Sequence, residues 1–152
     1  VSKANSYNVS MPPYNFKWGS NMVLLTGAMV LCIANNITGN NKYSEVIRFQ
    51  IDYLLGRNAM DTSYVTGFGD HAFKNPHNRP TASDNIEDPI PGYVSGGPNQ
   101  NHCDDYSLAN IKKDTAPMKC YVDHIDSFST NEITIYWNSP LIFILAYLDK
   151  IK

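Results

Sequence analysis

A long segment without helical periodicity, residues 57–130, limits most strongly how this chain can fold. The segment is rich in Gly, Pro, Asn and Asp, residues that favour turns over regular elements. A long irregular segment inside a compact domain usually carries a function. One short alternation of apolar and polar residues, 63–68, permits a strand. We therefore predict helices that support a long loop region, with the functional site on the loops.

Two stretches before this segment have helical periodicity. Residues 18–36 are apolar nearly all round, which is typical of a helix buried on more than one side, and Ser20 or Asn21 could cap its start. Residues 42–55 form a helix with one apolar face, which ends before Gly56 as a left-handed C-cap. Because the link between the two helices is short, we expect an antiparallel hairpin.

A third helix is predicted for residues 131–150, with Ser129 or Thr130 as its cap. Pro140 either kinks this helix or begins a fresh one that Ser139 caps. Helix pairs joined on one side by a long polar loop with aromatic residues indicate part of a helical barrel. We therefore expect an all-α fold with its site on the loop face.

Charge and cysteine content argue against several classes of protein. The chain has 12 Lys and Arg against 14 Asp and Glu, without the basic excess of a nucleic-acid-binding protein. The longest apolar run, residues 22–34, is shorter than the roughly 20 residues of a membrane span. Three cysteines do not make a disulfide framework. We expect neither a nucleic-acid nor a membrane partner.

Three carboxylates, Asp123, Asp126 and Glu132, lead into the predicted start of the third helix. Cleavage of a glycosidic bond needs one carboxylic acid and a second carboxylate across the sugar ring. The helix dipole favours the ionised form of Glu132, whereas nearby carboxylates oppose it, so Glu132 could stay protonated near neutral pH. The alternative is an ordinary glutamate that stabilises the helix start, and the pattern alone favours this alternative.

Two further clusters have alternatives of their own. His77 and Arg79, held between prolines, could present fixed donors to sugar hydroxyls, or belong to an ordinary polar loop. Four residues are of types that bind zinc: His102, Cys103, Cys120 and His124. However, His102 and Cys103 are adjacent and no Cys-x-x-Cys pair occurs, so we expect no zinc site. A structural calcium is an open alternative at another set: Asp84, Glu87, Asp88, Asp104 and Asp105.

The stretch 63–69 followed by 76–79 resembles the first signature of family 9 of the glycoside hydrolases. The family histidine falls on His77 and the family arginine on Arg79. His71 departs from the pattern, which usually has Asn, Lys or Arg at that position. The resemblance turns the His77 and Arg79 cluster from an ordinary loop into an expected sugar-binding element.

The second family signature fits throughout. Its aromatic residues fall on Tyr121 and Phe128, its active-site aspartate on Asp123 and its proton-donating glutamate on Glu132. Residues 91–92 and 96–99 are similar to the family's glycine-rich cleft loop. Two more stretches, 14–21 and 116–121, resemble the branch with an immunoglobulin-like domain ahead of the catalytic one, common among secreted clostridial cellulases and cellulosome enzymes.

The resemblance implies the C-terminal part of an (α/α)6 barrel, with residues 1–152 as the C-terminal portion of one catalytic domain and no internal domain boundary. It implies hydrolysis, with inversion, of β-1,4-glucosidic bonds in cellulose or related glucans outside the cell. Glu132 is the expected general acid, while the general base is an Asp in an upstream stretch that this chain lacks. The chain alone is therefore expected to be inactive and to need that missing N-terminal part as its partner.

The resemblance assigns catalytic roles to Glu132, Asp123 and His77. The residues expected to bind substrate are Arg79, Tyr93, Tyr106, Tyr121 and Phe128. No metal ligand and no cofactor is required for the chemistry. The alternative function is a non-catalytic sugar-binding or scaffold fragment, which the absence of the base would also fit.

Overall fold

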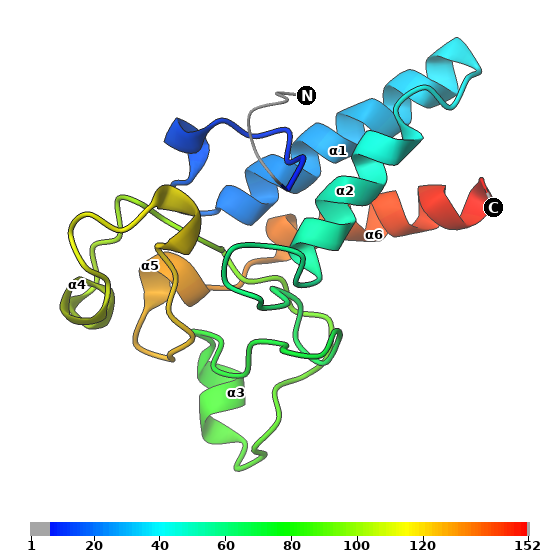
Figure 1. The fold of residues 1–152 in the computed structure, drawn as a ribbon. Helices are drawn as coiled ribbons and strands as arrows, with labels where there is room; N and C mark the ends of the chain where they lie inside the picture. The colour runs from blue at the N-terminus through cyan, green and yellow to red at the C-terminus, as the bar shows by residue number, and fades with distance from the viewer. Residues whose placement is uncertain (1–6, 152) are drawn as a thin grey trace.

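The structure is a computed structural model that describes residues 7–151. Its three long helices are α1 (Ser20–Thr38), α2 (Ser44–Leu54) and α6 (Ile135–Lys150), and α1 packs against the other two. Figure 1 shows these helices together on one side and the loop region on the other. The loop region holds the short elements α3 (Arg79–Ser83), α4 (Asp105–Asn110) and α5 (Phe128–Asn131) and the 3-10 helix η2 (Pro117–Lys119); a second 3-10 helix, η1 (Pro13–Asn15), precedes α1.

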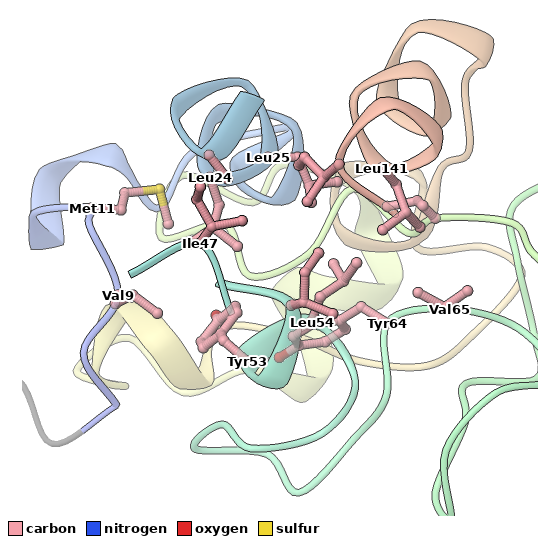
Figure 2. Packing of buried hydrophobic residues seen from close by; sticks show 14 of the residues in the cluster. Val9, Met11, Leu24, Leu25, Ile47, Tyr53, Leu54, Tyr64, Val65 and Leu141 are labelled. Carbon is pink, nitrogen blue, oxygen red and sulfur yellow. The ribbon is translucent and has the colours of Figure 1, made fainter. Parts of the chain in front are cut away.

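The core lies between the three long helices and the loops. Figure 2 shows Leu24 and Leu25 of α1 directed toward Ile47 of α2 and Leu141 of α6. Tyr53 closes this core from below; like Leu24, Leu25 and Ile47, it is at most 1% exposed. Burial of such side chains stabilises the fold by about 1.5–3 kcal/mol each. The predicted hairpin of α1 and α2 is confirmed, and Gly39, with φ of 65°, ends α1 in the left-handed conformation that glycine adopts without strain.

Two of the predicted helix starts are wrong. Helix α1 has Gly19 as its N-cap, without a side-chain cap. Instead of capping α1, Ser20 and Asn21 bond to the loop: the Asn21 Nδ2 donates to the Ser95 carbonyl oxygen at 2.9 Å. The third helix begins at Ile135 rather than 131, because its expected caps, Ser129 and Thr130, lie inside the separate helix α5.

Pro140 neither ends α6 nor begins a new helix, since the helix continues through it. Proline removes the backbone N–H that would bond to the carbonyl four residues earlier. In this helix that carbonyl belongs to Tyr136, and the Ser139 hydroxyl donates to it at 3.3 Å. The strand permitted at 63–68 is also absent from the described part of the chain, where two isolated bridges, Ser63 to Ala72 and Val65 to Val94, take its place.

One face of the helical layer remains open. On α1, Val30 is 55% and Ile37 is 80% exposed, and on α6, Ile135 is 91% and Ile142 is 67% exposed. Within residues 7–151, α1 is therefore covered by α2 and α6, while its face with Val30 and Ile37 is left uncovered. By length and composition alone α1 is also long and apolar enough to cross a membrane, although its contacts with α2 and α6 are those of a core helix.

Candidate active site

Glu132 lies at the junction between α5 and α6. It follows α5 in an extended conformation, with φ of −60° and ψ of 149°, and not in the first turn of α6. The expected effect of the helix dipole on Glu132 is therefore wrong. Its backbone is fixed on both sides, because its N–H donates to the Phe128 carbonyl oxygen at 3.2 Å and its carbonyl accepts from the Gly96 N–H at 2.9 Å.

His77 lies beside Glu132, and an isolated parallel bridge joins the two residues. The backbone N–H of His77 donates to the Asn131 carbonyl oxygen at 2.9 Å. Its ring Nδ1 lies 2.5 Å from the carbonyl oxygen of Ile125. Because a carbonyl oxygen only accepts, Nδ1 carries the proton, and Nε2 is left to bond elsewhere. The ring also packs edge-on against Phe128, with centroids 6.0 Å apart.

Asp123 fastens the loop that carries His77 to the end of α5. Its Oδ2 accepts from the Lys74 N–H at 2.7 Å, and its Oδ1 accepts from the Asn75 N–H and the Asn131 Nδ2, both at 2.9 Å. Both carboxylate oxygens are therefore engaged within the protein. This arrangement suits a carboxylate that positions its neighbours more than one that activates a water molecule.

Asn131 connects these residues and was not singled out from the sequence. It is fully buried, and its Oδ1 accepts from the Tyr121 hydroxyl at 2.6 Å. Tyr121 is 4% exposed and packs edge-on against Tyr64, so it supports the site from below and offers no face to a substrate. Burial, together with the charge of Asp123, raises the pKa of Tyr121 well above its usual value, so its hydroxyl stays protonated as a donor.

The other expected substrate-binding residues are spread over the loop face. Arg79 is exposed at the start of α3, and no ion pair holds it within residues 7–151. Tyr93 is half-buried and lines a surface pocket together with Ile133. Tyr106 and Phe128 line a different pocket, and Tyr106 stacks on His124 with ring centroids 3.6 Å apart. Of these residues, Phe128 contacts both His77, through their rings, and Glu132, through the backbone hydrogen bond.

Trp18 is a second residue that the sequence did not mark as part of the site. Its indole Nε1 donates to the Glu132 Oε2 at 3.0 Å, across 114 positions of sequence. Its ring packs against Phe128 with centroids 5.3 Å apart. The sequence indication for Trp18 was the resemblance of the stretch 14–21 to the family. Helical periodicity instead predicted that Trp18 is a core residue of a helix.

The glycine-rich loop explains why α5 and Glu132 stay in place. The Gly97 N–H donates to the Thr130 carbonyl oxygen at 2.9 Å, and the Asn99 Nδ2 donates to the Ser129 carbonyl oxygen at 2.9 Å. Gly97 has φ of 86°, and a Cβ added there would lie 2.5 Å from the side chain of Asn21. Glycine is therefore needed for this loop to fit between α1 and α5.

Asp104 holds α5 from its other side. Its Oδ1 accepts from the Ser107 N–H at 2.7 Å as the cap of α4, and its Oδ2 accepts from the Ser129 N–H at 3.0 Å and from the Ser129 hydroxyl. Burial acts to raise the pKa of Asp104, but the hydrogen bonds from Ser129 and Ser107 outweigh it, so the pKa lies below its usual value. Asp104, one of the carboxylates that a structural calcium could use, thus bonds to Ser107 and Ser129.

Metal ligands do not cluster in the described residues. No three His, Cys, Asp or Glu side chains between residues 7 and 151 lie close enough to hold a metal ion. The three cysteines are free in the structure, with Cys32 and Cys120 buried and Cys103 exposed.

Comparison with known proteins identifies the family of this site. The sequence model of glycosyl hydrolase family 9 matches residues 2–145. A cellodextrinase from Butyrivibrio fibrisolvens is 54% identical over 146 residues, which cover 96% of this chain and 27% of the relative. A cellulose 1,4-beta-cellobiosidase from Acetivibrio thermocellus is 48% identical over 90% of this chain and 16% of its own length. The chain thus spans about a quarter or less of these relatives.

Solved structures agree with the sequence relatives. The structure of AaCel9A in complex with cellobiose-like isofagomine matches with a TM-score of 0.91 and 38% identity, over 97% of this chain and 28% of that one. An endoglucanase from Alicyclobacillus acidocaldarius, solved as the variant D468A, matches with a TM-score of 0.89 and 39% identity, over 95% of this chain and 27% of that one. The expected all-α fold, part of an (α/α)6 barrel, is confirmed. This chain belongs to glycosyl hydrolase family 9.

Proposed function

We propose that this chain supplies the acid-bearing part of the active site of an inverting β-1,4-glucan hydrolase. The observation that carries the proposal is the setting of Glu132. Its backbone is held by the glycine-rich loop and bridged to His77, and no ion pair holds its carboxyl group among residues 7–151. A carboxyl group that no cation pairs with can hold a proton for a leaving group.

In this mechanism Glu132 protonates the departing glycosidic oxygen. A second carboxylate activates water on the opposite face of the sugar, at about 6.5–9.5 Å from the acid. Asp123 does not suit that second role, because both of its oxygens accept hydrogen bonds from the loop at 74–75 and from Asn131. The proposed base is therefore an aspartate in the part of the catalytic domain that precedes this chain.

The surrounding residues are proposed to bind the sugar next to the cleaved bond. His77 has its Nε2 free, and the Arg79 guanidinium is exposed, so both can bond to sugar hydroxyls. Tyr93, Tyr106 and Phe128 offer ring faces or edges for contact with sugar rings. Tyr121 is excluded from this role by its burial.

The protein that contains this chain is proposed to act outside the cell on cellulose or a related glucan, as the names of the relatives suggest: a cellodextrinase and a cellobiosidase. Residues 1–152 would form the C-terminal portion of one catalytic domain without an internal boundary, and the upstream part, with an immunoglobulin-like domain ahead of it, would complete the barrel. The chemistry needs no metal or cofactor, and any calcium would be structural.

The test is Glu132→Gln in the full-length protein that contains this chain. Glutamine keeps the shape of the side chain but cannot donate the proton, so turnover of unactivated glucans should fall by about 10²- to 10⁴-fold while glucan binding stays nearly unchanged. Substrates with good leaving groups should lose less. Full cellulase activity in this variant would remove Glu132 as the acid. If the unmodified protein binds glucan without hydrolysing it, the alternative of a sugar-binding fragment is correct.

A further inference from the structure

We propose that Trp18 is a positioning residue that decides which oxygen of Glu132 carries the proton. The inference rests on the proposed role of Glu132 as general acid and adds a second residue to it. Within residues 7–151, the Trp18 Nε1 is the one hydrogen-bond donor that reaches the Glu132 carboxyl group, at 3.0 Å from Oε2.

The direction of this hydrogen bond determines the position of the proton. An indole N–H donates and cannot accept. When Glu132 is protonated on Oε2, that atom becomes a hydroxyl oxygen, which is a weaker acceptor than the carbonyl oxygen, so the hydrogen bond from the indole N–H is weakened. The bond therefore favours the acid with Oε2 as the carbonyl oxygen and Oε1 as the hydroxyl. Oε1 is the atom that Trp18 leaves available to a leaving group.

The backbone alone does not orient this carboxyl group. The hydrogen bonds of Glu132 to Phe128 and Gly96 fix its main chain, but the side chain keeps its own rotatable bonds. Trp18 supplies the missing constraint, and its own ring is held against Phe128. General acid catalysis depends strongly on such alignment, because even a small misplacement of a catalytic group lowers the rate.

The position of Trp18 is itself built into the fold. It precedes Gly19, whose φ of 76° turns the chain into α1. The segment before it is bonded to Gln100, the residue that directly follows the glycine-rich loop. The Gln100 N–H donates to the Phe16 carbonyl oxygen at 2.8 Å, and the Gln100 Nε2 donates to the Pro13 carbonyl oxygen at 3.0 Å. The loop that holds the backbone of Glu132, through Gln100 at its end, thus also holds the segment that carries Trp18.

The first experiment compares Trp18→Phe with Tyr14→Phe in the full-length protein. Phenylalanine keeps a ring against Phe128 but removes the donor, while Tyr14 is an exposed aromatic in the same segment, outside the site. On a cellodextrin, Trp18→Phe should lower kcat about tenfold, the value of one ordinary hydrogen bond, with KM within about twofold. On a cellodextrin glycoside with an activated aryl leaving group, which needs little protonation, kcat should change less than about threefold. Tyr14→Phe should behave as the unmodified protein.

Two results would overturn the inference. One is an unchanged kcat on both substrates. The other is an equal loss on both with a raised KM, which would make Trp18 a sugar-stacking platform. Glu132→Gln measured in parallel separates this inference from the proposed function: if that variant is inactive on cellodextrin and Trp18→Phe is normal, only the role of Trp18 fails. If Glu132→Gln is fully active, the proposed acid fails.

A second measurement tests the inference without the Trp18→Phe variant, and so remains possible if that variant does not fold. With ¹⁵N-labelled tryptophan in the full-length protein, the indole N–H resonance of Trp18 should move with pH as Glu132 changes its protonation state. In Glu132→Gln the same resonance should stay constant over the same pH range. A resonance that does not move in the unmodified protein, or that moves equally in both, would show that the indole and the carboxyl group are not coupled.

Discussion

At the scale of single residues, the site depends on buried polar groups more than on the residues that face the substrate. Asn131 is fully buried and Asp123 is half-buried, and together they fasten the loop of His77 to the end of α5. A buried polar group left without its partner costs about 1–3 kcal/mol, so each link in this network constrains the next.

Asp104 is expected to make the stability of the folded protein depend on pH. Its pKa is lower in the folded protein than in the unfolded chain, where Asp titrates near about 3.9. The carboxylate therefore contributes stability above pH of about 4, and this contribution is lost as pH falls through the lowered folded pKa. At neutral pH Asp104→Asn should be less stable than the unmodified protein, and the difference should shrink toward strongly acidic pH.

The measurement is the melting temperature of both proteins as a function of pH. Asp105→Asn is the matched control, because Asp105 neighbours Asp104 but is exposed at the first turn of α4. The Asp104→Asn variant should also lose activity, since Ser129 then loses a charged acceptor and α5 is held less firmly. A stability difference that grows on acidification would contradict the assignment.

At the scale of elements, the helical periodicity of the sequence was sufficient to predict helices α1 and α2, but it did not predict the junction between α5 and α6. The residues 131–134 continue a helical pattern, yet the chain leaves the helix at Glu132 because the carbonyls of Thr130 and Glu132 accept hydrogen bonds from Gly97 and Gly96. These partners lie more than thirty positions away, so no local pattern contains them. The same holds for the caps expected at Ser129 and Thr130.

We predict that substitution of Gly97 in the glycine-rich loop lowers both stability and turnover. Gly97→Ala places a Cβ 2.5 Å from the Asn21 side chain at a φ of 86°, whereas Gly39→Ala meets no atom within 4 Å at a φ of 65°. Both variants incur about 1–2 kcal/mol for the left-handed backbone. Only Gly97→Ala must also displace the Asn21 side chain or the loop that bonds to α5, so it should be the less stable of the two and should lose turnover.

The comparison is made by denaturant unfolding and by glucan hydrolysis in the full-length protein. Gly39→Ala serves as the control for the backbone cost, since Gly39 ends α1 far from the loops. Equal losses of stability, together with normal turnover in both variants, would mean that the loop does not hold α5 in place.

At the scale of the whole molecule, the sequence was most informative where the family signatures fall and least informative about the tertiary network. His77, Asp123 and Glu132 were expected at the site and do lie together, joined by the bridge at His77 and by Asn131. Trp18 and Asn131 were missed, because one read as a core residue of a helix and the other as a polar neighbour of Glu132. Both acquire their roles only through contacts between distant segments.

The open apolar faces of α1 and α6 indicate what the rest of the molecule should cover. Seven large aliphatic side chains on α1 and α6 are 38–91% exposed: Val23, Val30, Ile33, Ile37, Ile135, Ile142 and Leu145. Large exposed apolar faces are typical of surfaces that another part of the protein covers. Because the chain spans about a quarter of its cellodextrinase relative, the upstream part of the same domain is the expected cover.

The last prediction joins this surface to the chemistry. The chain alone should self-associate and should not hydrolyse soluble glucan, since the proposed acid, Glu132, is only one of the two carboxyl groups that the proposed inverting site needs. Mixing it with the upstream part should suppress association and restore hydrolysis with inversion. Ile142→Lys places a charge on the open face of α6 and should block this rescue, whereas Ile86→Lys makes the same change on the loop side, at a residue 64% exposed against 67% for Ile142.

Two measurements decide the outcome: light scattering for association, and NMR of the released anomer for the stereochemistry. Rescue by the Ile86→Lys chain but not by the Ile142→Lys chain would locate the interface on α6. Inverting activity from the chain alone would mean that a base exists among these residues, with Asp126 the first to test, because it is exposed and lies just before α5, which Glu132 follows. Asp123 would follow, although its bonds to Lys74 and Asn75 would have to break before it could activate water.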